Sequence, residues 1–554
     1  MPFLLSAVLL AGLSCSAKPE LPKPDADDGA ISLPPGFRAL VVADDLGRIR
    51  FISVATNGDV YIKRTREGLI ALRDTDGDGR ADVTKTFGTN YGPGTGVCVR
   101  GGWLYFSTDN EVFRFPLKPG ELVPSGPAER IVTGLPGGRG HSAKAFTFDG
   151  EGRLYVEVGC PSNASGNPDR APGAKGVDPA ELFKRHGGFW RFDPDRKDQD
   201  QLRDGFHFSS GMRHALSVAW QPVAKSLFVT MMGRDQLNTV DSVHYNAQDN
   251  AEKPAEEFHK LQAGSHFGWP FTYWDPVRNV RMIGPEFGGD NEQMDMSGKY
   301  DPPLVALPAH WAPMQMLFYG GTQFPGRYRN GAFIAMHGSW NRAPLPQSGY
   351  NVVFIPFSEK GLPLGNYFEV FADDFAGIPV IKSPRDAHYR PCGIAEGPDG
   401  SLYVADSEKG RVWRIIYTGE KREVTRPVTM ISSNLPPGTP DTPASRLYAQ
   451  TCAVCHMGDG GGVPNMQPAL SGSAIVAGDP EQLIRVALLG SKALAADRVK
   501  YSNTMPQLDT LSDEQIALVL SYVRDQFGNQ SPAIRPEQVR KVRAESSDAK
   551  QGAP

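Results

Sequence analysis

The sequence lacks an excess of charge of either sign. Its 554 residues carry a formal net charge of only −4. A chain so nearly balanced offers no strongly basic surface, so we expect no nucleic-acid partner. It also lacks an apolar run long enough to span a bilayer, because the run at residues 2–13 is too short for that. Forty per cent of the residues are hydrophobic, which is enough for a sizeable buried core.

The apolar run at residues 2–13 has the length of the core of an export signal. Small residues and then a polar, Pro-rich stretch follow it, although no Lys or Arg precedes it. We therefore predict an export signal at 1–17 and a tether at 18–29. Cys15 after Leu13 and Ser14 resembles a lipoprotein cleavage site, and the sequence leaves open whether Cys15 is a lipid anchor. The expected location is the periplasm or the outside face of the membrane.

Cysteine is scarce, with six residues in the chain, and their spacing does not indicate a disulfide framework. Two of them stand in the Cys-x-x-Cys-His segment discussed below. Cys98, Cys160 and Cys392 lie far apart in sequence, so buried free thiols are the expected state, with one disulfide among the three as the alternative.

Glycine and proline are abundant, at 61 and 47 residues, which favours many short strands over long helices. Six copies of one pattern, a Gly-containing turn followed by a short alternating strand, recur between residues 30 and 420. The strands centre on positions 60, 104, 154, 227, 333 and 402. Because the shorter spacings match a four-stranded blade, we predict a mainly β fold, a six-bladed β-propeller over 30–420. A pair of β-sandwiches is the structural alternative.

The C-terminal part has a different, helical pattern. A Pro- and Ser-rich linker is predicted at 421–442, and Thr442-Pro443 then marks the start of a helix. Ser512 to Gln515 forms a capping box before an apolar helical face that ends at Gly528. We predict a small all-α domain at 443–530, followed by a charged, disordered tail at 531–554.

The segment Cys452-Ala453-Val454-Cys455-His456 predicts covalent attachment of haem c. Two thiols one helical turn apart can bond both vinyl groups of the haem, while His456 presents an imidazole to the iron. A zinc site would need two more soft ligands nearby, and a thioredoxin-type dithiol would need a βαβ context; neither is present. The helical domain also resembles class I cytochromes c, and that resemblance implies that Met505, followed by Pro506, is the second iron ligand. Met466 is the alternative, since Met457 adjoins His456 and cannot reach the other face of the haem.

Residues 30–420 resemble the soluble quinoprotein glucose dehydrogenase and L-sorbosone dehydrogenase families. The resemblance implies pyrroloquinoline quinone (PQQ) and calcium as cofactors, a sugar or aldehyde as substrate, and an external electron acceptor such as a cytochrome or oxidase. The segments that carry it are Pro35–Arg38, Gly138–His141, Ser210–Leu216, Gly233–Asp235, Gly268–Pro270, His337–Arg342 and His388–Pro391.

The same resemblance assigns roles to single residues. His141 is implied as the catalytic base, with a pKa expected near the working pH. Arg213 is implied to lie beside the reacting quinone oxygen, and the backbone carbonyls of Gly233 and Arg234 are implied to hold the cofactor's calcium. Three further residues are implied to bind the cofactor: Arg342, Arg390 and His388, the last standing where the glucose enzyme has arginine. The chain also has His214 where the glucose enzyme has asparagine, and Gly140 where it has aspartate, so glucose is not assumed as the substrate.

An acidic turn at residues 74–82 predicts a separate, structural calcium site. Asp74, Asp76, Asp78 and Asp82 occupy the spacing of a calcium loop, with a glycine at its sixth position. Lys85 stands where an EF-hand has its bidentate glutamate, which excludes a true EF-hand. A solvated acidic turn without metal is the alternative.

Together these patterns predict an exported quinohaemoprotein dehydrogenase that passes electrons from a quinone to its own haem. Two other functions stay open at this point. One is a propeller that binds a glycan or a protein and carries a cytochrome. The other is a propeller enzyme such as a lactonase, which would leave the haem unexplained.

Overall fold

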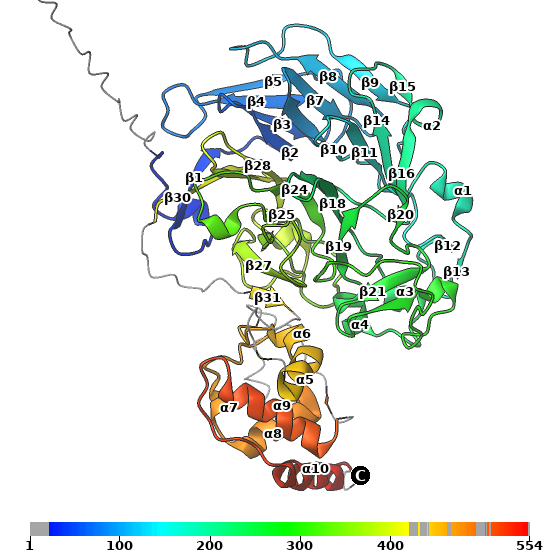
Figure 1. Ribbon diagram of the computed structural model, residues 1–554, viewed down its shortest axis with the longest axis vertical. Coiled ribbons are helices and arrows are strands. Elements are labelled where there is room, and N and C mark those ends of the chain that lie inside the picture. The colour runs from blue at the N-terminus through cyan, green and yellow to red at the C-terminus, as the bar shows by residue number, and fades with distance from the viewer. Residues whose placement is uncertain are drawn as a thin grey trace, which may run out of the picture.

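The computed structural model describes residues 21–138, 140–419, 430–432, 440, 442–462, 467–494, 505, 507–508 and 511–551. The predicted export signal, including Cys15, lies outside these residues. Among the described helices, none is both long and apolar enough to cross a membrane. Figure 1 shows the two parts of the chain, a ring of sheets and a smaller group of helices below it.

Six sheets form the blades of a β-propeller, and each predicted unit falls on the second strand of its blade, which confirms the predicted fold (Figure 1). Blade 1 is β2 (Ile49–Val54), β3 (Val60–Arg64), β4 (Leu69–Arg73) and β5 (Val83–Phe87); blade 2 is β6 (Val97–Arg100), β7 (Trp103–Ser107), β8 (Val112–Pro116) and β9 (Glu129–Thr133), joined by β15 (Gln199–Asp200). Blade 3 is β10 (Phe146–Phe148), β11 (Leu154–Val158), β14 (Gly188–Phe192) and β16 (Phe206–Ser210), joined by β20 (Ser265–His266); blade 4 is β17 (Ser217–Gln221), β18 (Ser226–Met231), β19 (Glu256–Leu261) and β23 (Val305–Leu307). Blade 5 is β24 (Pro313–Phe318), β25 (Ala332–Met336), β26 (Asn351–Ile355), β27 (Tyr367–Ala372) and β31 (Met430–Ser432); blade 6 is β28 (Pro391–Glu396), β29 (Leu402–Asp406), β30 (Val412–Tyr417) and β1 (Phe37–Ala43).

The second strands are buried because every blade packs between two others. All residues of β11, β25 and β29 are buried. A strand covered on both faces needs mainly apolar side chains, which is why the six units share runs of Leu, Val, Ile, Phe and Ala. The fold therefore follows from the sequence pattern.

The ring closes by pairing the two ends of the propeller sequence. β1 runs antiparallel to β30, with Phe37 opposite Tyr417. Gln315 on β24 adds a link at the innermost strands, because its side-chain oxygen accepts hydrogen bonds from Ile52 N and Ile394 N, both at 3.0 Å. Gln315 thus joins three blades near the centre. Its bonds occupy backbone donors on the inner strands β2 and β28 that would otherwise be free.

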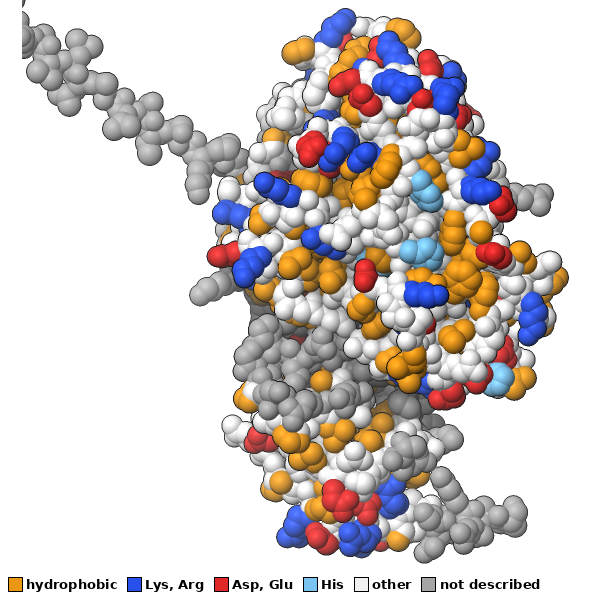
Figure 2. Space-filling view, turned by 45° about the vertical axis from the view of Figure 1, so that its right-hand side comes forward, with side chains coloured by type: hydrophobic (Ala, Val, Ile, Leu, Met, Phe, Trp, Pro, Cys, Tyr) orange, Lys and Arg blue, Asp and Glu red, His pale blue; other side chains and the backbone are white. Residues whose placement is uncertain are grey.

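Short elements in the loops complete the propeller. Two hairpins pair β12 (Gly166–Asn167) with β13 (Lys175–Gly176) and β21 (Thr272–Asp275) with β22 (Val280–Ile283). The helices are α1 (Ala180–Phe183), α2 (Gln201–Asp204), α3 (Leu237–Val240) and α4 (Ala247–Glu252), with 3-10 turns η1 (Asp28–Ala30), η2 (Pro285–Phe287), η3 (Gly326–Tyr328) and η4 (Pro384–Asp386). On the face drawn in Figure 2, acidic, basic and apolar side chains are interspersed, without a continuous basic patch.

The C-terminal domain packs its helices around one apolar cluster. The predicted caps are confirmed, since Thr442 accepts from Ser445 N at 3.1 Å and Ser512 accepts from Gln515 N at 3.2 Å. Its elements are α5 (Pro443–Thr451), α6 (Ala453–His456), α7 (Ala474–Ala477), α8 (Pro480–Leu489), η5 (Gly490–Ala493), α9 (Asp513–Asp525) and α10 (Pro536–Gln551).

Helix α10 contradicts the predicted disordered tail at 531–554. Its Val539 and Val542 are fully buried and belong to the apolar cluster of the C-terminal domain. Arg543 also forms an ion pair with Asp513 at the start of α9, at 2.8 Å. The tail folds because its few apolar residues lie on one helical face.

The predicted tether and linker also contain ordered contacts. Within the predicted tether, Asp25 accepts from Val41 N at 2.8 Å, and Asp28 pairs with Arg38 at 2.7 Å, so residues 25–28 pack against β1. Within the predicted linker, β31 pairs with β27 and extends blade 5. The rest of the linker between 420 and 441 lies outside the described residues, except residue 440.

The residue that follows the haem-binding motif joins the two parts of the molecule. Met457, directly after His456, is 3% exposed and belongs to an apolar cluster with Trp311 and Phe368 of the propeller. Figure 1 shows α6 at the end of the helical domain that faces the propeller. The haem attachment segment therefore lies against the propeller.

Candidate functional site

His141 lies between two loops, where its ring is fixed on two sides. Its Nδ1 lies 2.6 Å from the carbonyl oxygen of Cys160, and its ring stacks on His214 with centroids 4.7 Å apart. A carbonyl can only accept, so Nδ1 carries the proton and Nε2 is left as the acceptor. This is the tautomer that a base at Nε2 requires.

The pKa of His141 differs from the expectation based on sequence. Burial, followed by the charges of Arg213 and His214, lowers it to about 2 rather than leaving it near the working pH. His141 is therefore neutral over the whole physiological range. The sequence could not show this, because the residues that lower the pKa lie about 70 positions further along the chain.

Arg213 and Asp235 form a buried ion pair beside His141. Nη2 of Arg213 donates to the Asp235 carboxylate and Nη1 donates to Gly233 O at 2.9 Å. Burial alone would raise the pKa of Asp235, but Arg213, His310 and Arg170 hold it below its ordinary value. Asp235 is thus an ionised carboxylate held among several cationic or imidazole groups.

The backbone around Cys160 joins these two groups. Cys160 N donates to Arg213 O at 2.8 Å, while Cys160 O accepts from His141. The side chain of Asn163 bonds both N and O of Asp235, each at 2.8 Å. The loop after β11 therefore sets the positions of His141, Arg213 and Asp235 together.

Gly233 and Arg234, the predicted calcium carbonyls, stand next to a second buried carboxyl. Gly233 N donates to Glu256 at 2.8 Å, and burial raises the pKa of Glu256 to about 8. Gly233 O accepts from Arg213, and the Arg234 side chain pairs with Glu286. A cation at these carbonyls would thus lie near the carboxyls of Asp235 and Glu256 but would compete with Arg213 for Gly233 O. The calcium assignment stays a prediction.

The predicted cofactor arginines have different surroundings. Arg390 donates to His337 O at 3.1 Å, His337 Nδ1 at 2.9 Å and Gly338 O at 2.7 Å. Arg342 is 2% exposed and donates to Ala251 O and Pro346 O. The side chain of Arg390 keeps some exposure, at 14%, whereas the guanidinium of Arg342 holds the backbone of its own loop and of α4.

His388 is exposed, and no side-chain hydrogen bond of it is found among the described contacts.

The charge of Arg50 on β2 acts on two buried histidines near the centre of the propeller. Burial lowers the pKa of both His214 and His337, and the charge of Arg50 adds to the shift at each of them. Arg50 could not be identified from the sequence, because a single arginine on an inner strand gives no distinguishing pattern.

The haem attachment residues lie on α6 and its N-terminal end. Cys452 is buried, and Nδ1 of His456 lies 2.8 Å from Pro468 O. As for His141, the carbonyl fixes the proton on Nδ1 and leaves Nε2 available, which is the nitrogen a haem iron would bind. The side chain of Cys455 lies outside the described residues.

Met505 is held by its backbone, since Met505 N donates to Ser491 Oγ at 2.7 Å and Met505 O accepts from Ser491 N at 3.1 Å. Its half-buried side chain is consistent with a role as ligand, which stays a prediction. Pro506 and Met466 lie outside the described residues.

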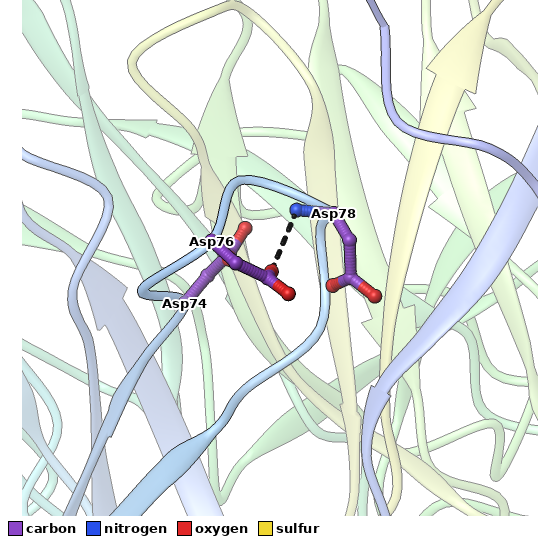
Figure 3. Close-up of side chains that lie close together, drawn as sticks. All are labelled: Asp74, Asp76 and Asp78. Carbon is purple, nitrogen blue, oxygen red and sulfur yellow. Dashed lines mark hydrogen bonds between the residues drawn. The ribbon is translucent and has the colours of Figure 1, made fainter.

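The acidic turn brings three of its four predicted ligands together. One carboxylate oxygen from each of Asp74, Asp76 and Asp78 lies within 4.8 Å of the others (Figure 3). Asp82 does not belong to this close group, and its carboxylate accepts from Thr75 N and Oγ1, both at 2.7 Å. The structure therefore supports a group of three carboxylates and leaves calcium binding there as a prediction.

A family model described as TrAA12-like matches residues 31–418, and a cytochrome c model matches residues 442–526. The chain belongs to the TrAA12-like family. Its C-terminal part is a cytochrome c domain, which implies haem c. The resemblance inferred from the sequence motifs is confirmed at this level.

Two relatives of this TrAA12-like chain match different parts of it. Over 193 residues it is 30% identical to a pyrroloquinoline quinone-dependent pyranose dehydrogenase of Coprinopsis cinerea. The matched stretch covers 30% of this chain and 25% of that protein. Over 96 residues it is 34% identical to the cytochrome c subunit of an alcohol dehydrogenase (quinone) of Gluconacetobacter polyoxogenes, 17% of this chain and 20% of that protein. The chain therefore spans a quarter or less of the length of these two relatives.

A solved structure supports the fold of the TrAA12-like domain. The calcium structure of a Trichoderma reesei enzyme of carbohydrate-active family AA12 aligns with a TM-score of 0.58 and 17% identity, over 70% of this chain and 97% of that one. At this identity the likeness establishes the propeller fold alone.

Two buried carboxyl residues of this TrAA12-like domain, Asp235 and Glu157, were not singled out from the sequence. Asp235 lies within the segment Gly233–Asp235 but was assigned no role, and Glu157 was not considered. The signal for Glu157 is visible in hindsight, because a carboxylate within the apolar strand β11 has to be buried with a partner.

Proposed function

We propose that this chain is an exported quinohaemoprotein oxidoreductase. It oxidises a sugar or an aldehyde with PQQ and passes the electrons to its own haem c and then to an external acceptor, such as a cytochrome or oxidase of the respiratory chain. The observation that carries the proposal is that one chain joins a TrAA12-like propeller to a cytochrome c domain. The relatives support it, since one is a PQQ-dependent pyranose dehydrogenase and another a cytochrome subunit of a quinone-type alcohol dehydrogenase.

The charges of the site suit an anionic quinone. PQQ has three carboxylates, and Arg213 presents a buried Nε that has no hydrogen-bond partner among the described residues. Arg390 and Arg50 add positive charge on the other side of the centre. Arg213 and Arg390 would therefore hold the cofactor, because guanidinium groups pair with carboxylates by paired hydrogen bonds. When bound, PQQ supplies the two-electron acceptor for hydride from the substrate.

His141 provides the base. Its neutral Nε2 can take the proton of a substrate hydroxyl, while the Nδ1 proton remains bonded to Cys160 O. Asp235 lies near enough to influence the pKa of His141 and favours the protonated ring after the transfer. The residues thus separate the two products of the oxidation, with the proton held at His141 and the hydride leaving toward the cofactor.

Calcium has two candidate positions. One is the group of Asp74, Asp76 and Asp78, where the oxygen ligands match the preference of the ion. The other is the backbone of Gly233 and Arg234, flanked by Asp235 and Glu256. The calcium structure of the T. reesei AA12 enzyme supports a role for this ion in the family.

The proposal is tested with purified protein, calcium, PQQ and a panel of sugars and aldehydes, using an artificial dye as electron acceptor. We expect dye reduction with at least one substrate only when PQQ is present. The His141→Ala variant should lower kcat by about 10²- to 10⁴-fold, the range for loss of a general base. The matched control is His244→Ala, since His244 is 46% exposed and pairs only with Asp241 among the described contacts. Dye reduction independent of PQQ, or full activity of His141→Ala, would contradict the proposal.

A further inference from the structure

The ring of His141 is packed against a second imidazole rather than against a carboxylate. Its face lies on His214, with ring centroids 4.7 Å apart and planes 30° apart. The two rings come from different loops, one before β10 and one before β17. The orientation of His141 therefore depends on what holds His214.

Glu157 on β11 holds His214. One carboxyl oxygen of Glu157 accepts from His214 Nδ1 at 3.0 Å and also from Ala215 N at 3.1 Å. Glu157 is 2% exposed and His214 is 6% exposed, so water does not compete with these bonds. His214 O also accepts from Met232 N at 2.8 Å, which fixes its backbone.

The contact between the two rings is tight enough to require a glycine next to it. A Cβ at Gly159 would lie 2.6 Å from His141 Cβ and 2.7 Å from His214 Nδ1. Both distances are shorter than real Cβ contacts, so any other residue would push the two histidines apart. Gly159 has an ordinary negative φ, so the requirement is one of space and not of backbone conformation.

We propose that Glu157 and His214 are positioning residues for His141. Glu157 fixes the ring of His214, and the face of His214 holds the ring of His141 in the orientation in which Nδ1 bonds Cys160 O and Nε2 remains the acceptor. This inference rests on the proposed function of His141 as base. It adds two residues that touch neither proton nor hydride but determine where the proton acceptor stands.

Two substitutions at Glu157 separate the effect of its hydrogen bonds from the effect of its charge. Glu157→Gln keeps a side-chain oxygen that can accept from both His214 Nδ1 and Ala215 N, so it should behave nearly as the natural protein. Glu157→Leu removes the acceptor and His214→Asn removes the stacked ring. Both should lower kcat by about tenfold to 100-fold with KM within about twofold, because a base displaced by about 1 Å loses rate rather than affinity.

The propeller contains a matched control for these variants. Glu257 and His259 on β19 form another buried carboxylate–imidazole pair, 3.1 Å apart, and the His259 ring stacks on Phe267. His259→Asn makes the same chemical change as His214→Asn in a pair that does not contact His141. It should leave kcat and KM unchanged.

A second measurement does not depend on catalysis or on PQQ. It is the exchange of the imidazole Cε1 hydrogen for deuterium, resolved by peptide mass spectrometry in the PQQ-free protein. The exchange rate reports how rigidly each histidine ring is held and how accessible it is to solvent. We expect exchange at His141 to be several-fold faster in Glu157→Leu and in His214→Asn. Exchange should stay at the natural rate in Glu157→Gln and in His259→Asn.

The outcomes separate this inference from the proposed function. If folded Glu157→Leu and His214→Asn both keep the natural exchange rate at His141 and the natural kcat, the inference is overturned while the function stands. An equal loss of activity in His214→Asn and His259→Asn would also overturn it, since the effect would then be general. If the natural protein oxidises no substrate, the proposed function fails, and the exchange data still decide whether Glu157 and His214 hold His141. His214→Asn serves as the decisive variant if Glu157→Leu does not fold.

Discussion

Arg213 and Asp235 show how far single residues of the site could be predicted. Arg213 was identified by resemblance, but its partner Asp235 and the carbonyl of Gly233 that receives it come from the packing of the structure. The same holds for His141, whose residue type suggested a base but whose lowered pKa depends on burial and on Arg213 and His214. Residue identity predicts the kind of chemistry, whereas the electrostatics of the site depend on residues brought together from different blades.

At this scale we predict that Asp235→Asn strongly destabilises the propeller. The change leaves Arg213 buried without an anionic partner, and removal of one member of a buried ion pair costs about 3–5 kcal/mol. Urea unfolding followed by tryptophan fluorescence measures the loss. The control is Asp195→Asn, because Asp195 is 83% exposed and its buried partner Arg114 keeps an ion pair with Glu129 at 3.0 Å, so we expect a loss of about 0–1 kcal/mol. Equal losses in the two variants would show that the Arg213–Asp235 pair has no special role.

At the scale of elements, the six second strands were predicted from their turns and the caps at Thr442 and Ser512 from their local motifs. Helix α10 was not predicted, because residues 531–554 are rich in charged and other polar residues and only a few apolar side chains mark its buried face. Its stability comes from the apolar cluster shared with α8 and α9, which local sequence does not reveal. Local sequence patterns thus predict the elements that have a turn or capping motif, whereas elements such as α10 depend on tertiary packing.

We predict that Val539→Asp, on the buried face of α10, destabilises the cytochrome domain without affecting the propeller. Val539 is fully buried, so the variant places a charge in an apolar cluster. The melting temperature of the haem domain, followed by circular dichroism in the Soret band, should fall by several degrees. Arg540→Ala on the exposed side of the same helix, with a side chain 66% exposed, should change it little. An unchanged melting temperature for Val539→Asp would contradict the packing of α10.

At the scale of the whole molecule, the buried histidines predict how stability depends on pH. Burial lowers the pKa of eight propeller histidines, so the unfolded chain, with ordinary pKa values near 6.5, binds more protons below that pH. The stability they contribute is present above about pH 6.5 and is lost as the pH falls below it. The eight are His141, His186, His207, His214, His259, His266, His310 and His337.

We therefore expect the free energy of unfolding of the propeller to fall between pH 6.5 and 5, by up to about 1.4 kcal/mol per pH unit for each histidine. Two buried carboxyls act in the opposite sense, since the pKa of Glu157 and of Glu256 is raised to about 8 and their contribution is lost as the pH rises through that value. Urea unfolding at several pH values measures the slope. His259→Asn should make it shallower by about one proton, and a stability independent of pH would contradict the burial of these rings in neutral form.

The central claim is that electrons from a substrate reach the haem through the propeller's cofactor. The most direct measurement is the absorption spectrum of the haem in the intact chain under anaerobic conditions, after addition of a sugar or aldehyde that the dye assay identifies. The account predicts haem reduction when calcium and PQQ are both bound, and none when PQQ is omitted. A haem that stays oxidised while the same protein reduces the dye at full rate would contradict it.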